Sequence, residues 1–310
     1  ALYFVPQMQN SAENTLAQDR TGARPATEFA RTPLPARLGR YKIFEEIGKG
    51  AMGVVYRALD PMINREVALK AIPLAAEFEG DELREARTKF FREAEMAGRL
   101  SHPHIVTIYD AGEDGGTAYI AMELLRGRHL VDFTQPARLL PPGIVIEIVA
   151  RLADALHYAH SNQVVHRDIK PANVMFDKAT GELKITDFGI ARLTDSNRTR
   201  TGVVLGTPSF MSPEQLQGRV VTGSSDLFSL AVTLYQLLTG QLPFRADSMP
   251  GLMLKIAQEP HVPARSVVPT LPAAIDAVLE RALAKDPTAR FPSGAAMALA
   301  LRELNKRPGS

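Results

Sequence analysis

The segment VVHRDIKPANVMF, residues 164–176, places polar side chains between two apolar runs. Asp168, Lys170 and Asn173 lie close together in a stretch that otherwise has the pattern of a buried strand. A solvated turn would explain the charges but not the apolar residues on both sides. A carboxylate, an amine and an amide at this spacing could accept a proton, steady an anion and bind a metal ion.

A second stretch suited to chemistry is the glycine-rich sequence IGKGAMGVVY, residues 47–56. Gly48, Gly50 and Gly53 have the spacing G-x-G-x-x-G, which lets a backbone approach a polyanion and present its amide hydrogens. A dinucleotide-binding turn would require a helix after this motif, whereas the pattern here predicts a strand. The motif therefore favours a flap over phosphates, with an ordinary hairpin as the alternative.

Two further charged residues follow apolar strands. Lys70 ends the strand VALK, where an ammonium group requires a partner unless it simply lies at the surface. The helical stretch 81–100 offers Glu93, with Glu95 as the alternative partner. Asp187 in TDFGIAR follows the short strand LKIT and is suited to bind Mg²⁺ together with the amide oxygen of Asn173. Asp168 would then accept the proton of an attacking hydroxyl, and Lys170 would steady a transferred phosphoryl group.

The composition limits the classes of protein to which the chain can belong. Apolar residues make up 45% of its 310 residues, charged residues 23%, and the formal net charge is +2, so neither nucleic acid nor an anionic membrane is indicated as a partner. The chain has no cysteine, which excludes disulfides, thiolate metal sites and cysteine nucleophiles. Its longest apolar run, residues 227–238, is too short to span a bilayer, and ALYFVPQ lacks the features of a signal peptide. We expect a fragment of a longer protein.

The periodicity predicts two lobes. Residues 1–38 are polar and proline-containing, typical of a flexible linker or juxtamembrane arm. Three strands in an antiparallel meander begin near residue 41, followed by the helix at 81–100 and a strand pair around a Gly-rich hairpin. Helical patterns dominate afterwards. We therefore expect a domain at 39–306, with an N-lobe at 39–122, a hinge at 123–127, a C-lobe at 128–306, and a tail at 307–310.

Taken together, the motifs match one family. IGKGAMGVVY, VALK, FREAE, HRDIKPAN, DFGIAR, GTPSFMSPEQ, SDLFSL and KDPTARF occur in the order found in protein kinases. Over residues 40 to 305 the chain resembles the eukaryotic-like, Hanks-type Ser/Thr protein kinases, above all their bacterial members. The resemblance implies an α+β, bilobal protein-kinase fold, with a small, mostly antiparallel β N-lobe containing one key helix and a larger, mostly helical C-lobe. It also favours Glu93 over Glu95 as the partner of Lys70.

The resemblance assigns roles to further residues. Val55 and Ala68 would lie above the adenine and Met175 below it, and Met122 would be the gatekeeper. Glu214 would pair with Arg290, and Asp226 would brace the catalytic loop. The implied catalytic set is Asp168, Lys170, Lys70 and Glu93; the metal ligands are Asn173 and Asp187; and the ATP-binding set is Ile47, Gly48, Lys49, Gly50, Gly53, Val55, Ala68, Lys70, Met122, Glu123, Leu125 and Met175.

The implied activity is transfer of the γ-phosphoryl of ATP to Ser or Thr hydroxyls of protein substrates, with Mg²⁺ or Mn²⁺ as the metal, in bacterial signal transduction. Thr199 and Thr201 are the expected autophosphorylation sites, Arg167 could pair with such a phosphate, and Thr207 is typical of the Ser/Thr class. Phosphorylation in trans by a homodimer would suit a receptor. A cytoplasmic location follows, either free or as the cytoplasmic part of a kinase with a transmembrane tether. The alternatives are a pseudokinase that binds nucleotide without turnover and a kinase of small molecules.

Overall fold

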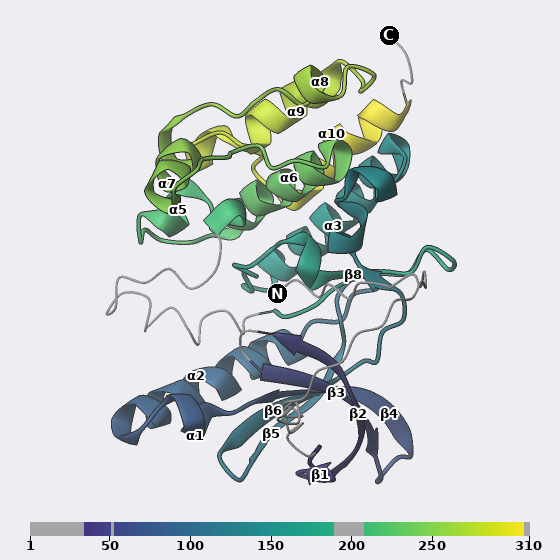
Figure 1. The fold of residues 1–310 in the computed structure, drawn as a ribbon, viewed down its shortest axis with the longest axis vertical. Helices are drawn as coiled ribbons and strands as arrows, with labels where there is room; N and C mark the ends of the chain where they lie inside the picture. Colours follow the sequence, from purple (N-terminus) through teal and green to yellow (C-terminus); the bar gives the residue numbers. More distant parts are fainter. Residues whose placement is uncertain (1–33, 51–52, 189–207, 307–310) are drawn as a thin grey trace, which may run out of the picture.

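A computed structural model describes residues 34–50, 53–188 and 208–306. It consists of two lobes (Figure 1): a β-sheet with a helix alongside, followed by a mostly helical lobe. The two-lobed α+β architecture expected from the sequence is confirmed.

The N-lobe contains a six-stranded antiparallel sheet in the order β1-β2-β3-β4-β6-β5. The expected meander is β2 to β4, and the expected hairpin is β5 to β6. Helix α2 lies beside the sheet and contributes the face containing Ala86, Phe90 and Ala94 to an apolar cluster. The bounds are β1 Arg37–Leu38, β2 Tyr41–Gly50, β3 Gly53–Asp60, β4 Arg65–Ile72, α1 Leu74–Glu77, α2 Gly80–Gly98, β5 Ile108–Asp114 and β6 Thr117–Met122.

The C-lobe is built around α6, whose residues are almost all buried. The polar ones are satisfied within the lobe; for example, the Ser229 hydroxyl donates to the Phe210 carbonyl at 2.6 Å. The bounds are β7 Arg128–His129, η1 Leu130–Phe133, η2 Pro136–Arg138, α3 Pro142–Ser161, η3 Pro171–Asn173, β8 Val174–Phe176, β9 Leu183–Ile185, η4 Pro208–Phe210, α5 Pro213–Leu216, α6 Gly223–Thr239, α7 Met249–Gln258, α8 Ala264–Val267, α9 Ala274–Ala282, η5 Pro287–Ala289 and α10 Gly294–Lys306.

Close packing of α10 on α3 depends on one glycine. A Cβ added to Gly294, the first residue of α10, would lie 2.1 Å from the Ala153 carbonyl oxygen on α3. No real Cβ tolerates that distance, so any larger residue would push the two helices apart. Their apolar faces, together with α6, form the main core of the molecule.

The regular structure begins earlier than expected. Arg37 and Leu38 form β1 and pair antiparallel with the start of β2, so the prediction that the arm extends to residue 38 was wrong at its end. The sequence hides this strand because two residues are too few to show a period. Residues 1–33 lie outside the described part of the chain. Among the described helices, none has both the length and the apolar content to cross a membrane.

Candidate active site

The loop at residues 166–173 brings two of the expected side chains, those of Lys170 and Asn173, to the carboxylate of Asp168. Lys170 Nζ donates to Asp168 Oδ2 at 2.7 Å, and Asn173 Nδ2 donates to Asp168 Oδ2 at 2.9 Å and to the Asp168 carbonyl at 2.8 Å. Asn173 is buried in η3, directly before β8. The opening cluster of the sequence is therefore a local hydrogen-bonded unit with Asp168 at its centre.

Asp226 fixes the backbone of this loop from α6. Its Oδ1 accepts the Arg167 amide at 2.7 Å, and its Oδ2 accepts the His166 amide at 2.8 Å. His160 of α3 lies 2.8 Å from the same Oδ2. Arg167 has a φ of 71°, a conformation that costs a non-glycine residue about 1–3 kcal/mol. These hydrogen bonds hold the strained residue directly before Asp168.

Asp187 follows β9 and reaches the N-lobe. Its Oδ1 accepts a hydrogen bond from Lys70 Nζ at 2.7 Å, and its own φ is 64°. Burial tends to raise the pKa of the Asp187 carboxyl, but the charge and hydrogen bond of Lys70 outweigh burial and hold the pKa below its usual value. The next residue, Phe188, is buried with its ring 4.5 Å from that of His166. Asp187 is thus ionised and directed toward Lys70.

The expected pairing of Lys70 with Glu93 is corrected by this contact. Among the described residues, the ion pair that Lys70 forms is with Asp187, not with Glu93. Glu93 is nonetheless buried, on the same face of α2 as Phe90 and Ala97. The carboxylates of Glu93 and Asp187 are alternative partners for the Lys70 ammonium. The positions of α2 and β9 relative to β4 determine which of them pairs with it, and the sequence alone does not specify those positions.

Four of the residues expected around the adenine, Val55, Ala68, Met122 and Leu125, come together in one apolar cluster, and Met175 is not part of it. Ala68 of β4 lies directly opposite Met122 of β6, and Val55 of β3 lies opposite Lys70 of β4. Val55 and Leu125 pack against the cluster of Ala68 and Met122. Met175 lies on β8 in the C-lobe, opposite His129. Of the phosphate-loop residues, Ile47, Gly48, Lys49 and Gly50 end β2, and Gly53 begins β3.

Packing within the sheet requires glycine at position 53, independently of any role in binding phosphate. Its φ is 142°, and an added Cβ would lie 1.9 Å from the Ala71 carbonyl oxygen on β4. The sheet itself therefore requires this glycine.

Sequence reasoning missed a link at the hinge. The Glu123 carboxylate accepts from Lys184 Nζ of β9 at 2.8 Å and from the Thr107 amide at 3.3 Å, and the Glu123 amide donates to the Thr107 carbonyl at 2.9 Å. The side chains of Lys184 and Glu123 are 12% and 24% exposed. No local pattern indicates this link, because its partners come from three separate segments.

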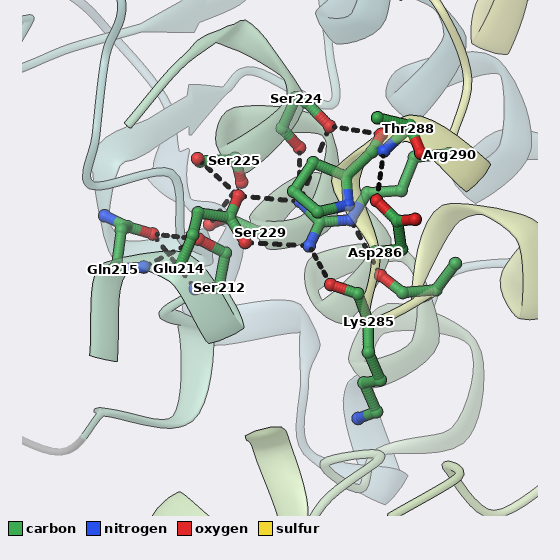
Figure 2. Close-up of polar contacts among 12 residues, drawn as sticks. Ser212, Glu214, Gln215, Ser224, Ser225, Ser229, Lys285, Asp286, Thr288 and Arg290 are labelled. Atoms are coloured by element: carbon green, nitrogen blue, oxygen red, sulfur yellow. Dashed lines mark hydrogen bonds and ion pairs between the residues drawn. The ribbon is translucent and has the colours of Figure 1, made fainter. Parts of the chain in front are cut away.

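Glu214 and Arg290 form the ion pair implied by the resemblance (Figure 2). Two hydrogen bonds of 2.8 Å join the guanidinium to both carboxylate oxygens, and the Ser225 hydroxyl donates to Glu214 at 2.6 Å. Arg290 also donates to the Ala284 carbonyl at 2.8 Å and to the Ser224 carbonyl at 3.1 Å. Burial tends to raise the pKa of Glu214, but the hydrogen bonds from Arg290 and Ser225 hold it below its usual value. This buried network ties α5 to α6 and to η5.

Thr199, Thr201 and Thr207 lie outside the described residues. Their predicted roles stay predictions. Arg167 is described, and its backbone lies in the catalytic loop.

A two-lobed fold with an ionised aspartate facing a strand lysine, and a catalytic loop of Asp, Lys and Asn, defines the class of protein kinases. The model of the protein kinase domain family matches residues 41–301, so this chain belongs to that family.

Curated relatives give the same family. The chain is 39% identical over 254 residues to serine/threonine-protein kinase PrkC of Bacillus subtilis, covering 82% of this chain and 38% of that protein. It is 39% identical over 272 residues to serine/threonine-protein kinase PknB of Mycobacterium leprae, covering 86% and 43%. A crystal structure of the Mycobacterium tuberculosis PknI kinase domain is 33% identical with a TM-score of 0.71, covering 88% of this chain and all of that one. The chain thus spans less than half the length of these curated relatives.

Proposed function

We propose that the chain is the catalytic part of an ATP-dependent protein Ser/Thr kinase. The observation that carries the proposal is the convergence of Asp168, Lys170 and Asn173 in one hydrogen-bonded loop, with Asp187 facing Lys70. Two Ser/Thr kinases at about 39% identity support it. Because the residues expected in catalysis are present, a pseudokinase is not favoured.

The reaction would be an in-line displacement at the γ-phosphorus. A substrate hydroxyl oxygen forms the new P–O bond, the bond to the β,γ-bridging oxygen breaks, and ADP leaves. Asp168 accepts the hydroxyl proton. Lys170, which donates to Asp168 at 2.7 Å, is close enough to neutralise charge on the transferred group. Lys70 would hold the phosphates of the nucleotide.

The donor set fits a hard divalent cation. The Asn173 amide nitrogen is occupied by two hydrogen bonds to Asp168, which fixes the orientation of its amide. Asp187 gives one oxygen to Lys70 and has a second oxygen available as a ligand. These two residues would hold Mg²⁺, or Mn²⁺ in its place. The bound metal would neutralise charge that develops on the phosphates.

For adenine we propose the apolar cluster of Ala68 and Met122 with Val55 and Leu125. Met175, on β8 of the C-lobe, would close the site from the other side. Backbone groups of Glu123 and Leu125 would bond the edge of the base. The hydrogen bond from the Glu123 amide to Thr107 supports this by fixing the hinge backbone.

The setting of the reaction is also a proposal. We infer that Thr199 and Thr201 are autophosphorylated in trans between two copies, and that the chain works in the cytoplasm as part of a longer protein with a transmembrane tether. The share of each relative that the chain covers supports a longer protein. A full-length gene product without an apolar run of about twenty residues would contradict the tether.

Autophosphorylation tests the function directly. The chain is incubated with Mg²⁺ and ATP, and phosphosites are mapped by mass spectrometry in the wild type, in Asp168→Asn and in Asp247→Asn, a matched control at an exposed carboxylate. We expect phosphate on Thr199 or Thr201 in the wild type and the control, and at least about a thousandfold less in Asp168→Asn. If the chain binds ATP but transfers no phosphate to itself or to a generic protein substrate, the proposal is refuted.

A further inference from the structure

Gln215, in the short helix α5, connects two parts of the chain that lie far apart in sequence. Its Oε1 accepts from the Ser212 amide and from the Ser212 hydroxyl, both at 3.0 Å. Its Nε2 donates to the carbonyl of Arg167 in the catalytic loop at 2.9 Å. One amide therefore joins the cap of α5 to the residue before Asp168.

The chemistry of the partners fixes the orientation of this amide. A backbone N–H can only donate and a backbone carbonyl can only accept, so the Gln215 oxygen must face Ser212 and its nitrogen must face Arg167. The reversed amide would place two donors together at Ser212 and two acceptors together at Arg167. Glutamine is the residue type that satisfies both ends.

Arg167 is held at both of its backbone polar groups. Asp226 of α6 accepts its amide at 2.7 Å, and Gln215 of α5 donates to its carbonyl. Its φ of 71° is unfavourable for an arginine, so these side chains stabilise a conformation that the residue would otherwise avoid. The peptide carbonyl held by Gln215 leads directly into Asp168, so a rotation of that peptide plane would turn the catalytic carboxylate.

We propose that Gln215 is a positioning residue for phosphoryl transfer, which orients Asp168 by holding the Arg167 carbonyl while its other end caps α5. The inference rests on the proposed function. It also lets α5 influence the catalytic loop, because a change in the position of α5 would reach the Arg167 carbonyl through this amide.

The competing explanation is that Gln215 only caps its own helix. Ser212 and Gln215 form a capping box, in which each side chain bonds the backbone of the other. Glutamate serves a capping box as well as glutamine does, but an ionised glutamate has no hydrogen to give to Arg167. Gln215→Glu therefore keeps the cap and breaks the link, whereas Ser212→Ala weakens the cap and keeps the link.

The experiment compares wild type, Gln215→Glu and Ser212→Ala at pH 8, where the new carboxylate is ionised. The measurements are kcat and KM for ATP with a generic protein substrate, the melting temperature, and hydrogen exchange of the peptide that covers residues 165–173. For Gln215→Glu we expect kcat to fall about tenfold because one hydrogen bond is lost at a strained site, with KM for ATP within about twofold, a melting temperature lower by about 2–4 °C and faster exchange. For Ser212→Ala we expect a lower melting temperature and kcat within about twofold of wild type.

A kcat for Gln215→Glu within about twofold of wild type, with unchanged exchange at 165–173, would overturn the positioning role. A wild type that binds ATP but transfers no phosphate would refute the proposed function instead. Hydrogen exchange would then still test the hydrogen bond from Gln215 to the Arg167 carbonyl. Faster exchange at 165–173 in Gln215→Glu than in Ser212→Ala would support its positioning role, and equal exchange in the two variants would refute it.

Discussion

On the C-lobe side of the active site Asp226 and Glu214 each have several partners, whereas on the N-lobe side Lys70 has a single ion pair among the described residues. Asp226 holds two backbone amides and lies against His160, and Glu214 is bonded by Arg290 and Ser225. The ion pair of Lys70, in contrast, reaches across to Asp187, whose side chain is 30% exposed. A multiply bonded, buried group cannot change partners without leaving polar atoms unsatisfied.

The difference indicates how the site divides its work. The C-lobe half is preorganised around Asp168, while the N-lobe half can exchange one ion pair for another at a small cost in free energy. Substitutions should therefore reduce stability most on the C-lobe side, and should reduce activity more than stability on the N-lobe side.

The largest expected effect on stability is that of Arg290→Met. The substitution leaves the Glu214 carboxylate buried without its guanidinium, which lowers the free energy of unfolding by about 3–5 kcal/mol. Arg302→Met is the matched control, because Arg302 pairs with Asp154 at 2.6 Å while both side chains are more than a third exposed. It should cost about 0–1 kcal/mol. Urea denaturation measures both, and equal losses would contradict the comparison.

The same network predicts loss of stability in acid. The pKa of Glu214 is lower in the folded chain than the ordinary 4.5, so its contribution is complete above about pH 4.5 and is lost as the pH falls through the lowered folded value. Asp187 acts with the same sign. The double variant Glu214→Gln/Arg290→Met should lose less free energy of unfolding than wild type between pH 5 and pH 3. Parallel curves from urea titrations at each pH would show that Glu214 contributes nothing.

On the N-lobe side the informative change is Glu93→Gln. In this structure Lys70 and Asp187 are paired with each other, yet the proposed reaction requires the lysine for phosphates and the aspartate for metal, so in that reaction another carboxylate must pair with the lysine. Buried Glu93 faces inward on α2, and we expect its substitution to lower kcat/KM at least about tenfold while stability changes by less than about 1 kcal/mol.

Glu95→Gln is the control for this test, since Glu95 is exposed on α2 and pairs with Arg99. It should have turnover within about twofold of wild type. Should Glu95→Gln be the impaired variant, the partner of Lys70 would be Glu95. Full activity in both would mean that α2 does not supply the partner at all.

The same division explains what the sequence could predict. The meander, the hairpin and the helix at 81–100 follow from periodicity, and the Asp168 cluster follows from residues close together in sequence. Lys70 pairs with Asp187 instead of Glu93 in this structure, because the pairing depends on how the two lobes are placed, which no local pattern specifies. The roles of Gln215 and Lys184 were missed for a related reason: each bonds a residue many positions away, and a glutamine or lysine has no distinctive local signature.

The hinge lies between the two halves and should have the smallest effect. Lys184 of β9 pairs with Glu123 at 2.8 Å, and the same carboxylate accepts the Thr107 amide, so one half-buried ion pair joins the C-lobe, the hinge and the loop before β5. Lys184→Met should raise KM for ATP about threefold with kcat within about twofold, because the hinge backbone that we propose to bond adenine is less firmly held while Asp168 is untouched. Lys184→Arg should restore most of the affinity.

The control for this prediction is Arg57→Met, which removes two exposed ion pairs of the sheet, those with Glu45 and Glu66. If KM for ATP rises as much in Arg57→Met as in Lys184→Met, the cause is a general loosening of the N-lobe. If KM rises only in Lys184→Met, the ion pair at the hinge is part of the preorganised half of the site.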